Sequence, residues 1–554
     1  MIYFMLFFLG RSLVIIFMMK KNNFELQPDI LFETKASIFF PIIGYFFLGN
    51  ILIFLNFFIP LKSFSTTIIL FFLFLINLLQ INKLEVKKIL NGKNYVIYFF
   101  IPLVLLVSTF DLNFHYDAAF YHLNHQNWLR ESNIVVGMVN IFWPYGIGSI
   151  SDYVSSIFWL EKTLINIHYL SIVFLSVFLS FIYLNISGKT KTSYTYPLVF
   201  IIIFSLLDNF GYNGGRNGFL YIQELGKQDL EVAVLVILIG LITVNLILKK
   251  LYSPIEFKIL MSFSLLSYQL KLSSLFIFSL IIFYIAFLLF HKLVNLKELF
   301  FGNIYILFFS IFWFIKNFLN SGCIIFPINI TCYNNLSWYR DGSTKYIEDY
   351  TSQTSFGLQS YLKDGVYGIE DWFKDFFYLN DPFSSFYRGY YLNFFISFLA
   401  IILLKIFFTK FIKFEKHSFV LIVSFCLFAI TYLTLYGPIP RYSSGILTLI
   451  VGLIGINIVQ FKKYNSIYLF QLLFVLSLLL IPRLNSYKSA FINQNIALPD
   501  PRFEWNYDEK KLNDQWISPI GTDICWINLY CTSEVGGELI LVEGYFKIVS
   551  RDLD

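Results

Sequence analysis

The chain has 554 residues, of which 57% are apolar and 14% charged, and its formal net charge is +6. An ordinary soluble domain carries about 25% charged residues, so this composition excludes a soluble enzyme and indicates an integral membrane protein. The positive charge does not indicate nucleic-acid binding, because most lysines lie in short loops between apolar segments, where they set orientation in a membrane.

A bilayer core about 30 Å thick is crossed by about 20 helical residues. By that measure the apolar segments are 2–19, 38–59, 64–81, 94–110, 164–185, 195–207, 229–248, 258–269, 272–290, 301–319, 390–408, 418–436, 443–460 and 465–481. The sequence therefore predicts an all-α polytopic membrane protein with about 14 transmembrane helices.

Lysines accumulate in alternate loops, as expected for one cytoplasmic face. Examples are Lys20, Lys21, Lys83, Lys87, Lys189, Lys191, Lys249, Lys250, Lys292, Lys297, Lys410, Lys413, Lys462 and Lys463. The opposite, external face then receives four long segments and both termini. The predicted regions are N-terminal helices (1–108), a first external loop with an interfacial helix (109–163), a central bundle (164–319) with an external loop (208–228), an aromatic-rich external loop (320–389), C-terminal helices (390–481) and an external tail (482–554).

Two pairs of cysteines lie on the predicted external face. Cys323 and Cys332 share one loop, and Cys525 and Cys531 share the tail. An oxidising compartment allows two disulfides, but the short spacing is equally compatible with four free thiols. In the same tail, the alternating segment ELILVEGYFKIV (538–549) predicts a β-hairpin.

The fourth apolar segment leads directly into TFDLNFHYDAAFYH (109–122), which contains Asp111, Asp117 and His122. The residues that follow have helical periodicity and predict an amphipathic helix at the membrane interface, with Trp128 at the level of the lipid headgroups. One interpretation of Asp117 is structural, as the N-cap of this helix. The other is catalytic.

A carboxylate at the mouth of a membrane helix can act as a general base on an external hydroxyl, beside a donor whose leaving group is a polyprenyl phosphate. Asp117 is the first candidate for this base and Asp111 the second. His122 can support the carboxylate, contact substrate or act as a structural hydrogen-bonding group. The Asp and His cluster can hold a divalent metal, but no spacing in the chain specifies a metal or another cofactor.

A lipid phosphate also requires cations. Arg441, in the short turn GPIPRYSSG (437–445), is the best candidate because arginine binds phosphate oxygens bidentately. Lys271, in QLKLSS, is the second. The alternative for both is a side chain that reaches out of the membrane to the interface.

The loop DNFGYNGGRNGFLYIQELGKQDLE (208–231) adds Arg216, Lys227 and Asp229 as candidate substrate contacts. Asp229 has a structural alternative, because acids at the start of a helix are favoured by the helix dipole. In the loop 320–389, Trp338, Tyr339, Trp372 and Tyr378 can stack on sugar rings or can pack together as a small folded lid.

Five segments in order along the chain carry a resemblance to a known family. They are YDAAFYHLNHQNWL (116–129), GMVN (137–140), KNFLNSGCIIFP (316–327) with Trp338 beyond it, GPIPRYSSG (437–445) and CWINLYCT (525–532). Through them the chain resembles the GT-C glycosyltransferases, and more narrowly an uncharacterised family of bacterial GT-C-like membrane proteins. GT-C enzymes carry a catalytic acid in the first external loop, which matches Asp111 and Asp117, although that loop follows the fourth predicted helix here. The resemblance also implies a lipid-phosphate contact near Arg441 and a second acidic residue near Asp229.

The resemblance implies a glycosyltransferase in the bacterial inner membrane with its active site on the extracytoplasmic side. Its partners would be a polyprenyl-phosphate-linked sugar donor, a glycan or lipid acceptor and the bilayer, with no nucleic acid, in the biosynthesis of cell-surface glycans. The alternatives are a polysaccharide polymerase or ligase that uses lipid-linked repeat units, and a transporter or flippase. A transporter predicts ionisable groups near the membrane midplane, and the apolar segments are almost free of them.

Overall fold

The computed structural model describes most of the chain. The described residues are 2–14, 30–79, 92–107, 114, 116–159, 164–188, 191–210, 228–340, 343–354, 356, 369–378, 382–411, 416–436, 439–461, 467–480, 508–534 and 537–552. All structural statements below concern these residues.

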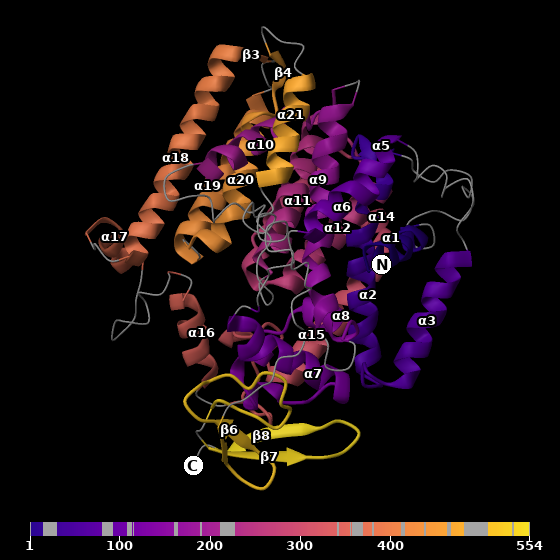
Figure 1. Cartoon of the computed structure of the whole chain (residues 1–554), viewed down its shortest axis with the longest axis vertical. Helices are drawn as coiled ribbons and strands as arrows, with labels where there is room; N and C mark the ends of the chain where they lie inside the picture. The colour runs from indigo at the N-terminus through magenta and orange to yellow at the C-terminus, as the bar shows by residue number, and fades with distance from the viewer. Residues whose placement is uncertain are drawn as a thin grey trace.

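The described chain is mainly helical (Figure 1). The α-helices are α1 (Ile2–Leu13), α2 (Phe40–Asn56), α3 (Phe64–Leu79), α5 (Gly92–Tyr95), α6 (Ile101–Val107), α7 (Leu123–Glu131), α8 (Ile150–Ser156), α9 (Ser171–Ser187), α10 (Thr195–Phe210), α11 (Asp229–Lys249), α12 (Pro254–Leu270), α13 (Ile277–Phe290), α14 (Leu296–Gly302), α15 (Ile304–Ser321), α16 (Ser343–Thr354), α17 (Ile369–Tyr378), α18 (Pro382–Phe408), α19 (Lys416–Tyr436), α20 (Pro440–Ile454) and α21 (Ile467–Leu480). The strands are β1 (Ile30–Leu31), β2 (Thr34–Lys35), β3 (Thr409–Phe411), β4 (Ile458–Phe461), β5 (Glu509–Lys511), β6 (Ile517–Pro519), β7 (Glu538–Val542) and β8 (Ile548–Asp552).

Each apolar segment found in the sequence contains a helix in the part that the structure describes, although the segment 443–460 ends in strand β4 and not in the helix. Within that part of the chain, five helices are long and apolar enough to cross a membrane. These are Ala36–Asn56, Asp229–Lys249, Leu272–Phe290, Ile304–Ser321 and Arg388–Phe408. The coarse expectation of a helical membrane protein is therefore confirmed, whereas the number of about 14 spans stays a prediction.

Helix α11 forms the centre of the bundle. Its most apolar stretch is completely buried, and it packs against α9, α12, α13 and α20. A helix that is apolar on all sides fits such a position. By contrast, α18 lies at the edge (Figure 1) and exposes most of its apolar surface, as expected for a helix that faces lipid.

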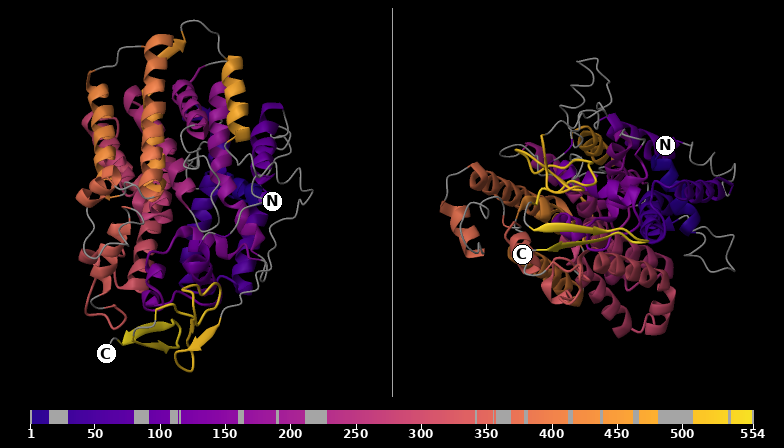
Figure 2. Two further views of the ribbon diagram at one scale, coloured as in Figure 1. Left: turned by 60° about the vertical axis from the view of Figure 1, so that its left-hand side comes forward. Right: turned by 90° about the horizontal axis from the view of Figure 1, so that it is seen from below.

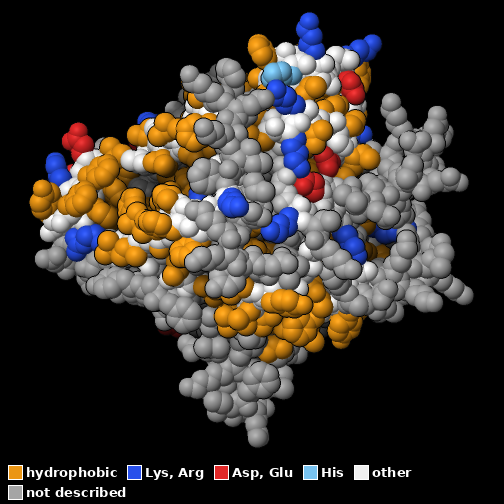
Figure 3. Space-filling model, turned by 90° about the horizontal axis from the view of Figure 1, so that it is seen from above, with side chains coloured by type: hydrophobic (Ala, Val, Ile, Leu, Met, Phe, Trp, Pro, Cys, Tyr) orange, Lys and Arg blue, Asp and Glu red, His pale blue; other side chains and the backbone are white. Residues whose placement is uncertain are grey.

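One end of the bundle gathers loops that the sequence assigns to the cytoplasm. In the turn between β1 and β2, the Glu33 carboxylate accepts hydrogen bonds from the Asn245 side chain at 2.8 Å and the Ser193 backbone at 3.1 Å, and it forms an ion pair with Lys249. Strand β3 pairs with β4 at the same end (Figure 1). Neither of these two small sheets was predicted. Figure 3 shows the Lys and Arg side chains spread over this face.

The opposite end carries a cap, by which we mean residues 116–159, 322–340, 508–534 and 537–552. These residues come from three predicted external regions that are distant in the sequence: the first loop, the loop 320–389 and the tail 482–554 (Figures 1 and 2). Val136 pairs with Ile548 in β8, and the Asn140 amide donates to the carbonyl oxygens of Trp338 and Val549, at 2.9 Å each.

The cap contains both cysteine pairs as disulfides, Cys323–Cys332 and Cys525–Cys531. Strands β7 and β8 form the hairpin that the alternating pattern predicted, and β5 pairs with β6 beside it. The prediction of a small β-containing C-terminal region is thus confirmed.

The position predicted for Trp128 is wrong. Its ring is 1% exposed and packs against Trp516 and Tyr530 of the C-terminal region. The periodicity of this helix therefore reflects burial inside the cap, and Trp128 does not lie among lipid headgroups.

Candidate functional site

Asp117 lies directly before a π-helical turn, Ala118–His122, that continues into α7. Its backbone is already helical, and its side chain accepts no capping hydrogen bond. The N-cap interpretation of Asp117 is therefore wrong. Wide turns of this kind often occur at functional sites, because the extra residue changes the direction of neighbouring side chains.

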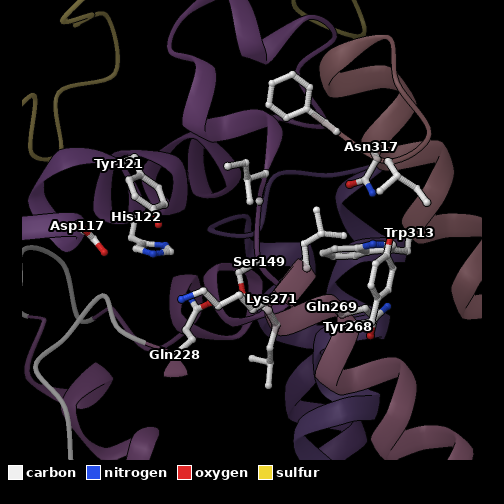
Figure 4. A pocket seen from close by; sticks show the side chains of 16 residues that line it. Asp117, Tyr121, His122, Ser149, Gln228, Tyr268, Gln269, Lys271, Trp313 and Asn317 are labelled. Carbon is white, nitrogen blue, oxygen red and sulfur yellow. Dashed lines mark hydrogen bonds between the residues drawn. The ribbon is translucent and has the colours of Figure 1, made fainter. Parts of the chain in front are cut away.

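Asp117 and His122 line a pocket together with residues from the ends of α12 and α15 (Figure 4). The lining residues are Asp117, Tyr121, His122, Ile147, Gly148, Ser149, Gln228, Tyr268, Gln269, Leu270, Lys271, Leu272, Trp313, Asn317, Ile325 and Phe326. The cavity volume is about 80 Å³, which corresponds to about two or three water molecules. The pocket is thus lined by three of the candidate residues from the sequence analysis: Asp117, His122 and Lys271.

His122 is buried and is held by Asp152 at the start of α8. Its Nδ1 lies 2.9 Å from Oδ1 of Asp152. Burial raises the pKa of the Asp152 carboxyl, but His122 and His125 outweigh burial and hold that pKa well below its ordinary value. An ionised carboxylate only accepts hydrogen bonds, so Nδ1 of His122 donates. In a neutral ring the free lone pair then lies on Nε2, and this nitrogen can accept a proton as a general base does.

Asp152 organises a second layer of polar groups behind the pocket. Its other oxygen, Oδ2, lies 2.8 Å from Nδ1 of His125, and Gln126 donates to Oδ1 at 3.3 Å. Burial lowers the pKa of His125, and this effect exceeds the opposing effect of Asp152. His125 is therefore a neutral donor that fixes the carboxylate.

Lys316 of α15 approaches the same wall. Its side chain is completely buried, and its Nζ lies 4.0 Å from the centre of the Trp313 ring. Within the described residues, Nζ contacts no hydrogen-bond acceptor. A Cβ atom placed on Gly148 would lie 3.0 Å from this Nζ, so the ammonium group lies directly behind the pocket wall.

Lys271 and Asp229 form an ion pair on another side of the pocket. Lys271 follows the last residue of α12, and Asp229 is the first residue of α11. Nζ of Lys271 also lies 4.6 Å from the centre of the Tyr442 ring in α20. A second, smaller pocket lies beside Asp229 and Tyr442, so the ion pair stands between two cavities.

The remaining candidates are placed differently. Arg441 is the second residue of α20, next to Tyr442 and thus near Lys271, but its side chain lies outside the described residues. Trp338 packs edge-on against Phe318 in the cap and does not line the pocket.

Asp111, Arg216 and Lys227 lie outside the described residues. Gln228, which directly follows Lys227, lines the pocket, so the end of the loop 208–228 reaches the site.

The sequence analysis missed Asp152 and gave Lys316 no role. The sequence contains one feature that could have identified each of these two residues. Asp152 is the only acidic residue between Glu131 and Glu161, and Lys316 interrupts an apolar helix three residues after Trp313. In the described part of the chain, no group of three or more His, Cys, Asp or Glu residues is arranged to hold a metal ion.

The sequence model of a family described as a domain of unknown function, DUF8201, matches residues 1–448. The matched region contains every residue that lines the pocket and excludes the C-terminal strands. No curated protein and no solved structure matches.

Proposed function

We infer that this chain, which belongs to the DUF8201 family of domains of unknown function, is a membrane glycosyltransferase of GT-C type. It would transfer a sugar from a polyprenyl-phosphate-linked donor to an extracytoplasmic acceptor in the synthesis of a cell-surface glycan. The observation that carries the proposal is the pocket in which Asp117, His122 and Lys271 meet at the ends of apolar helices.

The proposed chemistry uses these three groups. The oxygen of an acceptor hydroxyl forms a bond to the anomeric carbon of the donor sugar, and the bond from that carbon to the phosphate oxygen breaks. Asp117 accepts the proton of the hydroxyl, and the polyprenyl phosphate leaves with the bonding electron pair. Lys271 stabilises the negative charge of the leaving group as a point charge.

His122 is the second candidate for the base, because its Nδ1 is bound to Asp152 and its Nε2 is left to accept a proton. The pair resembles the base and orienting carboxylate of a catalytic triad, in which the carboxylate fixes the tautomer. Separate substitution of Asp117 and His122 distinguishes the two assignments.

The location of the pocket supports a lipid-linked donor. It lies where α12 and α15 end beneath the cap, so a phosphate at the membrane surface and an external hydroxyl can both approach it. A sugar phosphate is larger than the cavity of about 80 Å³. The pocket is open on one side, so the donor lies partly outside it, and Lys271 of the ion pair with Asp229 between the two pockets is the group that a phosphate competes for.

The proposal is tested by complementing a strain that lacks the gene with Asp117→Asn and with Lys271→Gln. We expect both variants to insert in the membrane, to lose the surface glycan and to accumulate the lipid-linked donor. A general base contributes about 100-fold or more to a rate. The matched controls are Asp514→Asn and Lys510→Gln, two exposed residues of the cap. An unchanged glycan in both test variants would show that the pocket has no role in transfer.

A further inference from the structure

Several aromatic rings form a surface on the outer side of the cap. On α16, Tyr346 and Tyr350 stack with ring centres 6.2 Å apart and nearly parallel planes. The Trp143 ring meets Tyr350 edge-on at 5.7 Å. Tyr346 is 68% exposed, although a large aromatic ring gains from burial. We call Tyr346, Tyr350, Trp143 and the nearby Tyr116 the aromatic platform.

The platform reaches the pocket. Tyr116 directly precedes Asp117 in the chain, and its exposed ring stacks on Phe120 at 5.0 Å. Burial and a hydrogen bond to Asp523 raise the pKa of Tyr116, with smaller contributions from Asp117 and Tyr350. Tyr350 of α16 and Asp117 therefore both lie near the Tyr116 hydroxyl, which links the rings of α16 to the residue that precedes Asp117.

The chemistry of the platform suits a glycan chain. A sugar ring has one face of weakly hydrated C–H groups, which packs on the negative face of an aromatic ring. Its hydroxyl groups need polar partners at the edges. Here the exposed Asp523 accepts a hydrogen bond from Tyr116, and the partly exposed Asp349 lies 2.8 Å from Nζ of Lys345 on the same helix as the tyrosines. On α16, Glu348 and Asp349 both lie near a single lysine, Lys345, and Asp523 adds a further carboxylate beside Tyr116. This excess of negative charge opposes anionic lipid headgroups, so a neutral glycan fits this surface better than a membrane.

The aromatic residues predicted from the sequence do not form this surface. Trp372 is buried against Phe376 and Tyr391, and Trp338 is packed on Phe318. Trp372 is therefore packed as the alternative of a folded lid expects, and the sugar-stacking role of Trp338 stays a prediction. The rings of the platform belong to three different segments, the residues before α7, the loop before α8, and α16, which only the fold brings together.

We propose that the aromatic platform binds the acceptor, and that this acceptor is a neutral glycan chain several sugars long. The inference rests on the proposed function, because it assigns the acceptor of that same site. The growing end of the chain lies at Asp117, and the preceding sugars stack on Tyr350 and Tyr346.

The test measures binding and does not require turnover. The full-length protein is purified in detergent and titrated with surface polysaccharide of its own source strain, cut by mild acid into short and long oligosaccharides. We expect Tyr346→Ala to weaken binding of the long fragments about 3- to 10-fold and to leave binding of the short ones unchanged. Tyr346→Phe keeps the ring and should bind like the wild type. Tyr545→Ala, at a 65% exposed ring in the turn between β7 and β8, is the matched control.

Two results overturn the assignment. Either Tyr346→Ala binds long fragments as the wild type does, or Tyr545→Ala weakens binding to the same degree. The outcome is independent of the transferase test. If binding depends on Tyr346 while Asp117→Asn still produces normal surface glycan, the platform is a glycan site and the proposed reaction is wrong. If Asp117→Asn abolishes the glycan while Tyr346→Ala binds normally, the reaction stands and the platform does not bind its acceptor.

Discussion

Nδ1 of His122 lies 2.9 Å from Oδ1 of Asp152, although the two residues are 30 positions apart and belong to different helices. The same carboxylate receives His125 on its other oxygen at 2.8 Å. A buried carboxylate is costly unless it is hydrogen-bonded, and two histidine donors meet this requirement. Asp152 is therefore the residue that holds both imidazoles in one tautomer and one orientation.

We expect Asp152→Asn to damage the site without removing any group from the pocket. An amide offers an N–H donor where one histidine Nδ1–H needs an acceptor, so one buried ring must change tautomer or lose its partner. The loss should be about 3 kcal/mol in the free energy of unfolding, measured as a lower thermal unfolding temperature in detergent. Transfer should fall with its pH profile altered, because Asp152 acts through His122. Asp514→Asn is the control, and an unchanged pH profile would contradict a positioning role.

Much of the fold could be predicted because it depends on local patterns. Long apolar runs predicted the helices, and the alternation in 538–549 predicted the hairpin of β7 and β8. The helix that contains Trp128 was predicted correctly but placed wrongly, since periodicity shows which face is apolar and not what covers it. Its cover, Trp516 and Tyr530, comes from a segment about 400 residues later.

The site was predictable only in part, for the same reason. Asp117, His122 and Lys271 have unusual sequence surroundings, at the boundaries of apolar runs, and the structure brings these three together. Asp152 and Lys316 matter through contacts with distant elements, and such contacts depend on topology. The partner of Lys271, the Asp229 carboxylate, was a candidate by itself, but the ion pair between them was not foreseen.

Stability should depend on pH through His125. Burial lowers the pKa of this ring below its ordinary value of about 6.5, so the unfolded chain binds a proton that the folded chain does not. Protonation of His125 in the unfolded chain therefore does not reduce the free energy of unfolding above about pH 6.5. Below that pH the free energy of unfolding falls by at most about 1.4 kcal/mol per pH unit. Thermal unfolding between neutral and mildly acidic pH measures this slope.

The variant His125→Gln should reduce the slope, because glutamine keeps a donor for Asp152 but does not titrate. His291, an exposed histidine after α13, provides the control His291→Gln, which should leave the slope unchanged. A slope that persists in full in His125→Gln would assign the pH dependence to another group.

Lys271 and Asp229 should have opposite effects on anion binding. Lys271→Gln removes the cation and should weaken the binding of a short-chain polyprenyl phosphate about 10- to 100-fold. Asp229→Asn removes the carboxylate that competes with a phosphate for Lys271, so it should strengthen binding. Titration of the purified protein with this lipid measures both, with Lys510→Gln as the control. Weaker binding in Asp229→Asn would mean that the pair holds Lys271 in place for the phosphate, and the competition argument would fail.

The attachment of the C-terminal hairpin to the rest of the cap can be tested at a single glycine. Gly137 has φ +71°, and its backbone N–H donates to the carbonyl oxygen of Leu319 at 2.8 Å. A Cβ atom at this position would lie 2.1 Å from the carbonyl oxygen of Val549 in β8. Gly137→Ala therefore has two costs, an unfavourable left-handed backbone of about 1 kcal/mol and displacement of the hairpin.

Substitution of a second glycine, Gly521, measures the backbone cost without the displacement of the hairpin. Its φ is +73°, and no atom of the described residues lies within 4 Å of an added Cβ atom. Gly521→Ala should therefore lower the free energy of unfolding by about 1 kcal/mol, whereas Gly137→Ala should lower it by about 3 kcal/mol. Gly137→Ala should also make the chain before β7 sensitive to limited proteolysis. Equal losses in the two variants, with equal proteolysis, would mean that β8 does not depend on its contact with the first loop.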